Sequence, residues 1–308
     1  MKVRAATRLL GYWIAAWMLA AGAGAAWAAD LSDDQITVEP PQSAWQFRFT
    51  PYAWLLFLDG EQTIKGRTAD VDTNIFEIIR ESDSLVGWMS YLEARRGPLA
   101  LYADIYYGKL TLSGGGDVTI KPNNFVSATI AADANIEYEF AVVELGGAYE
   151  VSRWNRGGAM DAADFGAYTA LDLIAGGRYW YQKAELDLAL ASQLNIAGIT
   201  INGNRAIAGS GGVDWIDPLL GARLRHHMAP GEEIILRGDV GGFGVASDFS
   251  WQLIGAYSWV FSDWRGIDWA GVVGYRALYV DYSEGKGANK FRYDILTHGP
   301  ILGLSMRF

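Results

Sequence analysis

From Trp45 to the C-terminus, the chain alternates between apolar and polar residues with a period of two. In the first such stretch, Trp45, Phe47 and Phe49 take the apolar positions and polar residues lie between them. The same alternation recurs over residues 86–95, 99–107, 171–182, 220–225, 234–240, 251–261, 269–279 and 299–308. Because successive side chains of a β-strand point to opposite faces, this pattern predicts strands with one apolar and one polar face. The fold is therefore expected to be all-β.

The polar face of these segments carries Arg and Asp in mid-strand, and the apolar face carries aromatic residues near the strand ends. In a soluble β-sandwich, two such apolar faces would pack on each other. In a transmembrane barrel they face lipid, with aromatic girdles at both interfaces and charges in the lumen. A tilted strand needs about 9–11 residues to cross a bilayer, and the segments reach that length. We therefore predict a closed antiparallel transmembrane β-barrel, with a secreted soluble β-sandwich as the less favoured alternative.

The lengths of the connections agree with a barrel, because outer-membrane barrels have short periplasmic turns and longer outer loops. Short turns are expected at 96–98, 229–232 and 262–265, and longer outer loops at 58–84, 113–135, 196–212, 245–249 and 283–291. Residues 152–165 would form a longer inner turn. This arrangement gives about ten strands that start and end on the periplasmic side.

Some positions leave the strand number open. Phase slips near residues 142–143 and 183–185 are expected to be bulges or hidden turns, so eight or twelve strands remain possible. Pro51, Pro218 and Pro300 fall inside proposed strands, although proline cannot donate a ladder hydrogen bond. We expect bulges or strand ends at these prolines.

The first 28 residues have the layout of a secretory signal peptide. A basic start is followed by an apolar run and by an A-x-A cleavage site, Ala26-Trp27-Ala28. An uncleaved membrane anchor is the alternative, since the apolar run approaches the length of a spanning helix. Residues 29–44 are acidic and aperiodic and are expected to form a flexible periplasmic tail, and residues 45–308 the barrel.

Charge and composition exclude several function classes. The chain has 25 basic and 35 acidic residues, and loss of the leader removes three basic residues and no acidic one, leaving a net charge of −13. So acidic a protein is not expected to bind nucleic acid. The absence of cysteine excludes disulfides, Cys-ligated zinc and thiol nucleophiles.

The C-terminal stretch GPILGLSMRF carries a further signal, because a closed barrel must pair its last strand with its first and stop at the interface. Its strict alternation and final Phe308 resemble the C-terminal signature of bacterial outer-membrane β-barrel proteins. The stretches RGDVGGFGVASDFSWQLIGAYSWVFSDWRG and FRYDILTHGPILGLSMRF are also similar to a little-characterised proteobacterial outer-membrane barrel family. The resemblance covers most of the chain after the leader. It implies a Gram-negative outer-membrane barrel and recognition of Phe308 by the barrel assembly machinery, and it brings no established activity.

Motifs for catalysis or metal binding are weak. His226 and His227 lie beside a predicted periplasmic turn, and His298 has no partner recognisable by spacing, so interfacial histidines are favoured over catalytic ones. The stretch DVDTN (70–74) begins like a calcium loop but lacks the required glycine and flanking helices. A solvated loop is favoured there over loose binding of a divalent cation that would also use Glu77 and Asp83. The stretch GGFG (241–244) lacks the Lys-Ser/Thr of a phosphate loop.

The most informative residues are the charged ones at the polar positions of the alternation. In a barrel, these side chains would point into the lumen. They are Arg48, Glu93, Arg95, Asp104, Glu144, Arg178, Arg223, Arg225, Arg237, Asp239 and Arg276. Buried charges are tolerated when paired, so a mixed-sign interior indicates first a structural network that fills a narrow barrel. The alternative is an anion-attracting ladder of Arg223, Arg225, Arg237 and Arg276 along a pore.

We therefore predict a non-enzymatic outer-membrane barrel with a largely plugged lumen, no catalytic residue, no cofactor and no metal. Its role would be structural or one of surface contact in the envelope. Its partners would be outer-membrane lipid, lipopolysaccharide and the assembly machinery. A narrow ion or small-solute channel is the main alternative, and a lipid hydrolase is a weaker one.

Overall fold

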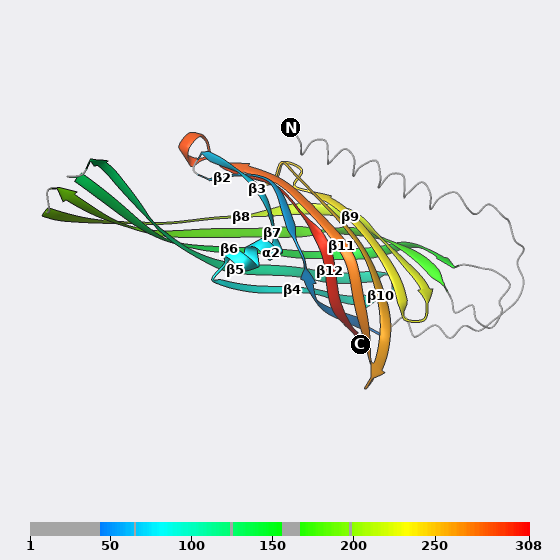
Figure 1. Ribbon diagram of the computed structural model, residues 1–308. Helices are drawn as coiled ribbons and strands as arrows, with labels where there is room; N and C mark the ends of the chain where they lie inside the picture. Colours follow the sequence, from blue (N-terminus) through cyan, green and yellow to red (C-terminus); the bar gives the residue numbers. More distant parts are fainter. Residues whose placement is uncertain (1–43, 65, 124–125, 156–166, 197–198) are drawn as a thin grey trace, which may run out of the picture. The chain divides into compact units, whose positions relative to one another are not determined.

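The structure is a computed structural model that describes residues 44–64, 66–123, 126–155, 167–196 and 199–308, most of them in β-strands (Figure 1). The expected signal peptide, nearly all of the expected tail and most of the expected turn over 152–165 lie outside the described residues. Ten strands form one wall: β1 (Gln46–Trp54), β4 (Ser84–Arg96), β5 (Leu99–Asn123), β6 (Val126–Asn155), β7 (Tyr168–Ile196), β8 (Ile199–Ala229), β9 (Glu232–Gly241), β10 (Phe249–Trp264), β11 (Ile267–Glu284) and β12 (Phe291–Arg307). A short 3-10 helix, Gly287–Asn289, lies between β11 and β12.

The wall closes on itself with antiparallel pairing throughout. Its order is β1-β4-β5-β6-β7-β8-β9-β10-β11-β12, and β12 also pairs with β1, so that the blue first strand runs beside the red last strand in Figure 1. At the closure, Phe47 and Phe308 exchange two backbone hydrogen bonds, of 3.2 and 2.9 Å. The predicted closed antiparallel barrel of ten strands is confirmed. We call the end that carries Gln46 and Arg307 the terminal end, and the opposite end the hairpin end.

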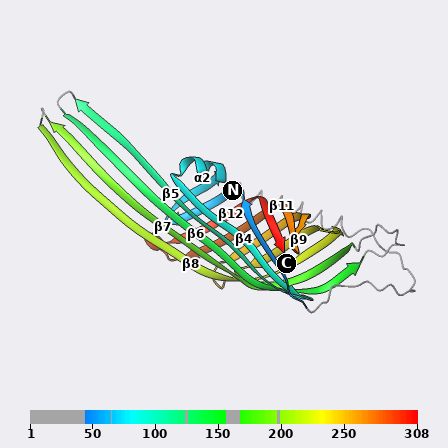
Figure 2. The same cartoon turned by 90° about the horizontal axis from the view of Figure 1, so that it is seen from below.

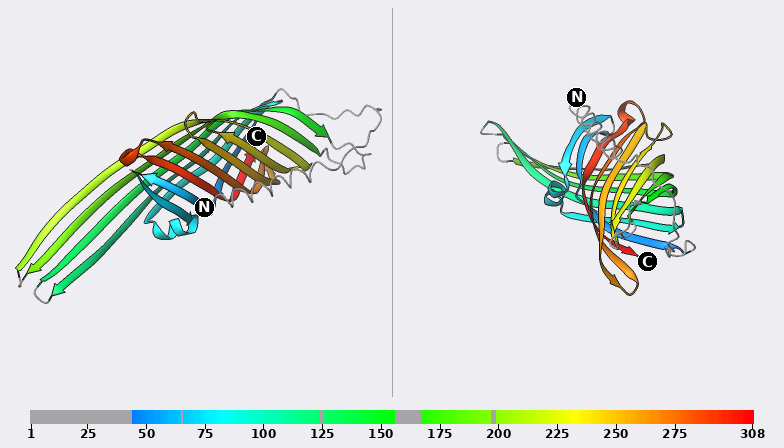
Figure 3. Two further views of the ribbon diagram at one scale, coloured as in Figure 1. Left: turned by 90° about the horizontal axis from the view of Figure 1, so that it is seen from above. Right: turned by 90° about the vertical axis from the view of Figure 1, so that its right-hand side faces the viewer.

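Residues 58–84, expected to be an outer loop, are largely ordered into two further strands and a helix. β2 (Phe57–Ile64) pairs with β3 (Arg67–Asn74) and with the half of β12 that lies beyond β1. The helix α2 (Ile75–Glu81) follows, and the Asn74 side chain caps it by accepting the backbone N–H groups of Phe76 and Glu77. In Figure 3 the cyan α2 lies next to the blue β2 and β3. The expectation of a loop was wrong here.

The strands β5 to β8 are 25–31 residues long, far more than a bilayer requires. They continue past the other strands as a four-stranded extension at the hairpin end (Figure 2). The loops expected over 113–135 and 196–212 are therefore mostly the paired ends of two hairpins. Continuous pairing satisfies the backbone hydrogen bonds of these segments, so small and polar side chains do not prevent them from forming strands.

The structure also explains the irregular positions. Pairing runs without a register shift through residues 142–143 and 183–185, and the wall instead has shifts at 120–123, 150–152, 227–229 and 260–262. Pro51 is the last residue of β1 that pairs with β4, and Pro218 lies one residue beyond the β8–β9 ladder. Pro300 lies where β12 changes partner from β1 to β2. The prolines thus lie where a ladder ends or changes partner.

The exterior of the wall is apolar between its two ends. The exposed large side chains there include Phe47, Leu92, Leu101, Leu145, Leu173, Ile216, Leu220, Leu236, Val240, Val273, Leu302 and Leu304. Towards the hairpin end, Tyr107 and Tyr181 follow on the same face of β5 and β7, and charged residues come next. Among the described residues, no helix is long and apolar enough to cross a bilayer.

Closure can be tested with an engineered disulfide, because the chain has no cysteine of its own. Thr50 on β1 and Ser305 on β12 face each other across the closing pair, with their hydroxyl oxygens 2.9 Å apart. We expect Thr50→Cys/Ser305→Cys to form a disulfide on mild oxidation, read as a mobility shift of the heat-denatured chain on a non-reducing gel. The control is Thr50→Cys/Ser90→Cys, whose residues lie on adjacent strands but on opposite faces. Equal cross-linking in the two variants would contradict this closure.

Candidate functional site

The inner face of the wall carries a dense set of ion pairs, which we call the lumen network. Its arginines are Arg48, Arg95, Arg178, Arg223, Arg225, Arg237, Arg276 and Arg307, and its carboxylates are Glu93, Asp104, Glu144, Glu150, Asp172, Glu233 and Asp239. All eleven residues predicted to line the lumen belong to it, and each makes at least one ion pair. Nine of them are at most 8% exposed.

Sequence reasoning missed Glu150, Asp172, Glu233 and Arg307. The parity of three of them was readable: Glu150, Asp172 and Glu233 occupy the same alternate positions as the predicted lumen residues of their strands, Glu144, Arg178 and Arg237. β12 contains no predicted lumen residue, and Arg307 joins the network as the pairing partner of Arg48 on β1.

The most deeply buried part of the network joins three strands. The Arg178 guanidinium donates to Glu144 at 2.8 Å and to Asp239 at 2.7 Å, and Arg237 also pairs with both carboxylates. Gln252 donates its amide N–H to Asp239 at 2.9 Å. Arginines on β7 and β9 thus face carboxylates on β6 and β9, and Gln252 connects this three-strand group to β10. Such pairing offsets the desolvation of the buried charges.

A second group is centred on the fully buried carboxylate of Asp172. It accepts hydrogen bonds from Arg95 at 2.9 Å, from Arg223 at 2.9 Å and from Arg225 at 3.0 Å. Arg223 also pairs with Glu93 of β4, on the other side of the lumen. The network therefore crosses the barrel as well as following its wall.

Two smaller groups lie towards the ends. At the terminal end, Glu233 pairs with Arg48 at 2.7 Å and with Arg307 at 3.4 Å. Further towards the hairpin end, Arg276 pairs with Asp104 at 2.9 Å, and the Tyr52 hydroxyl donates to the same carboxylate at 2.7 Å.

Beyond these charges, aromatic residues fill the hairpin end of the lumen. We call this cluster the aromatic plug; it comprises Trp54, Tyr106, Trp180, Trp215, Tyr282 and Tyr293. Trp215 stacks on Tyr282 with ring centroids 4.0 Å apart, and Ile75 and Ile78 of α2 pack against the plug. The buried carboxylate of Asp217 accepts the indole N–H groups of Trp180 and Trp215 at 3.1 and 3.3 Å. The plug is thus anchored to the wall as well as packed.

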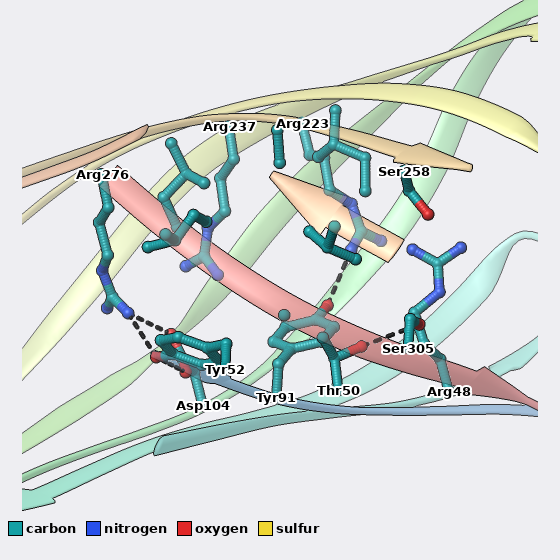
Figure 4. A pocket seen from close by; sticks show the side chains of 16 residues that line it. Arg48, Thr50, Tyr52, Tyr91, Asp104, Arg223, Arg237, Ser258, Arg276 and Ser305 are labelled. Atoms are coloured by element: carbon teal, nitrogen blue, oxygen red, sulfur yellow. Dashed lines mark hydrogen bonds and ion pairs between the residues drawn. The ribbon is translucent and has the colours of Figure 1, made fainter. Parts of the chain in front are cut away.

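A cavity of about 110 Å³ lies inside the lumen beside the network (Figure 4). Its lining includes four arginines, Arg48, Arg223, Arg237 and Arg276. Apolar side chains of β9 to β12 also line it: Ile235, Ile254, Ala256, Val272 and Ile301.

The histidines and the acidic segment have different surroundings from those expected. His298 does have partners: its imidazole lies 3.0 Å from the Asp59 carboxylate and 2.6 Å from the Tyr275 hydroxyl. Its hydroxyl partner is the phenol of Tyr275. Asp70 and Asp72 lie in β3 rather than in a loop, and no group of His, Asp or Glu in the described part of the chain is arranged to hold a metal ion.

Charged pairs on the exterior lie just beyond the two tyrosines. Lys109 lies 2.6 Å from Glu137, and Lys183 lies 2.5 Å from Glu185. The hydrogen bond to Glu137 raises the pKa of Lys109, and the bond between Lys183 and Glu185 raises the pKa of the lysine and lowers that of the carboxyl. These two ion pairs mark where the apolar exterior ends.

Comparison with known proteins gives weak similarities. No protein-family model and no curated protein matches the chain. Among solved structures, it is similar to the attachment invasion locus protein Ail of Yersinia pestis, with 8% identity, a TM-score of 0.26 and coverage of 86% of this chain and 99% of Ail. A FadL homologue of Pseudomonas aeruginosa has 9% identity, a TM-score of 0.26 and coverage of 86% and 89%. OprD of the same organism has 7% identity, a TM-score of 0.21 and coverage of 86% and 94%. These identities and TM-scores are too low to support a conclusion about this protein. The assignment of the fold is based on the strand pairing.

The buried pairs should dominate stability. In Glu144→Gln, two buried arginines lose a counter-charge, so we expect the free energy of unfolding to fall by about 3–5 kcal/mol. The control is Glu137→Gln, which breaks an exterior pair that is more than one-third exposed and should cost about 0–1 kcal/mol. Urea unfolding in lipid vesicles, followed by tryptophan fluorescence, measures both. Equal losses would show that the network contributes no more than a surface pair.

Proposed function

We propose that this protein is an integral outer-membrane β-barrel with a lumen closed to solutes, and that it has a structural or surface-contact role rather than an enzymatic one. The observation that carries the proposal is the state of the lumen charges. The arginines and carboxylates of the network are ion-paired, eleven of the fifteen are buried, and the aromatic plug fills the end beyond them. A conducting path needs wetted, available charges.

The exterior supports placement in a membrane. An apolar face that surrounds a barrel is costly in water and favourable in lipid. The tyrosines that follow it match an interfacial girdle, and the ion pairs beyond them match the water side. The A-x-A leader and the terminal Phe308 support export through a cleaved signal peptide and insertion by the barrel assembly machinery.

The long hairpins support a role in contact outside the membrane. The paired strands β5 to β8 continue well past the exterior tyrosines. With the hairpin end outside the cell, as we propose, this length extends into the lipopolysaccharide layer and beyond it. Loops and extensions carried on a rigid barrel are common places for binding functions. We therefore assign lipid and lipopolysaccharide as the immediate partners of the protein.

The membrane placement predicts a depth-dependent cost of charge on the exterior. Leu145 is 60% exposed in the middle of the apolar face, so Leu145→Arg should destabilise the folded protein in lipid by about 2–4 kcal/mol. Thr111→Arg, on the same face beyond the tyrosines, should cost about 0–1 kcal/mol. Urea unfolding in vesicles provides the comparison. If Leu145→Arg proved as mild as Thr111→Arg, this face would not be in lipid.

The closed lumen predicts silence in a planar bilayer. Folded wild-type protein should show no discrete openings, because the network and the plug are two barriers in series. Removal of one barrier, in Glu144→Ala/Arg237→Ala or in Trp180→Ala/Trp215→Ala, should leave the bilayer silent, and the combined quadruple variant should conduct. Insertion and folding are checked in parallel by heat-modifiable gel mobility. Steady wild-type openings with a preference for anions would replace this proposal with the channel alternative.

A further inference from the structure

The cavity inside the lumen is lined by two chemically different sets of side chains. Its charged lining residues are four arginines and one carboxylate, that of Asp104. The carboxylates that pair with three of these arginines, Glu93, Glu144 and Glu233, are not among the lining residues. The charged lining of the cavity is therefore mainly cationic. Figure 4 shows Arg276, Arg237 and Arg223 in a row along it, and Arg48 beside Ser305 and Thr50.

Two of the arginines that line the cavity keep a hydrogen-bond donor without a partner. The Nε–H groups of Arg237 and Arg276 are buried and have no hydrogen-bond partner in the structure, although both side chains are at most 5% exposed. A buried N–H without a partner carries a desolvation cost that an acceptor in the cavity would remove. Hydroxyl groups add further polar lining, from Thr50, Ser258 and Ser305.

The second set of lining side chains is mostly branched and aliphatic. It consists of Ile235, Ile254, Ala256, Val272 and Ile301, on β9, β10, β11 and β12. A bare inorganic anion would leave these apolar side chains without a favourable contact. A ligand that carries a short alkyl group would cover apolar surface as well as supplying acceptors.

Access to the cavity is different at its two ends. Arg48 and Arg307, at the terminal end, keep 20% and 19% of their side chains exposed, against 5% for Arg223 and Arg237 and 3% for Arg276. The aromatic plug and α2 fill the hairpin end. The cavity is therefore a dead end that is approached from the terminal end.

We infer that this cavity is a binding site for a small organic monocarboxylate, of the size of propionate. The carboxylate accepts hydrogen bonds from the lining arginines, because charge-assisted bonds are strong, and the alkyl group lies against the aliphatic lining residues. A volume of about 110 Å³ corresponds to roughly three or four water molecules, which suits a ligand of this size.

The test is a calorimetric titration of the full-length mature protein in detergent with sodium propionate at constant ionic strength. We expect saturable binding with a dissociation constant on the order of 1 mM, within the reach of so small a ligand. Propionamide has the same shape without the charge and should bind at least tenfold more weakly. Chloride lacks the alkyl group and should also bind at least tenfold more weakly.

A pair of matched variants locates the site. Val272→Leu enlarges a side chain that lines the cavity and should weaken propionate binding at least tenfold. Val273→Leu makes the same change on the apolar exterior and should leave binding unchanged. Heat-modifiable mobility confirms that both variants are folded. The inference is overturned if propionate does not saturate the folded wild type, if propionamide binds equally well, or if the two variants bind alike. None of these results depends on whether the barrel conducts.

Discussion

A charge that is buried inside a barrel must meet an opposite charge inside the same barrel, because neither lipid nor bulk water can supply one. The lumen network follows from this constraint. Arg178 and Arg237 face Glu144 and Asp239, and Asp172 gathers three guanidinium groups. The resulting bonds connect strands that are neighbours in the wall and strands that face each other across it. Removal of one partner is therefore costly, whereas the removal of a whole pair leaves no unmatched charge behind.

Closure is what brings these residues together. Arg48 and Glu233 are 185 positions apart, and Arg223 and Glu93 are 130 apart, yet both pairs meet in the lumen. The faces of the strands could be predicted from the sequence, because the period of two assigns each residue to one side of the wall. The partners could not, because they depend on strand number and on the stagger at closure, which local patterns do not contain. Asp172 and Glu233 were missed although their parity was correct.

The errors of prediction have a common physical cause. Residues 58–84 and the tips of the long hairpins carry many small, acidic or glycine residues, which are typical of loops. In the barrel, each of these segments lies beside a strand whose backbone groups are available. For β2, that strand is the part of β12 that precedes Pro300. Pairing to an existing edge outweighs weak intrinsic propensity. The prolines, which seemed to argue against strands, lie where such an edge ends or changes partner.

The same constraint explains why the lumen is closed and yet retains a cavity. Arginines on β8 and β9 reach across to carboxylates on β4 to β7, so the charged residues concentrate on that side of the barrel. Strands β10 to β12 contribute mostly aliphatic and small residues to the cavity, apart from Arg276 of β11, which pairs with Asp104. The remaining space is small and is lined by both guanidinium groups and aliphatic side chains. A lumen blocked by the aromatic plug at one end cannot pass a solute along its length, but it can hold one that enters from the other end. Closure to flow and binding of a small ligand are therefore compatible consequences of one asymmetric interior.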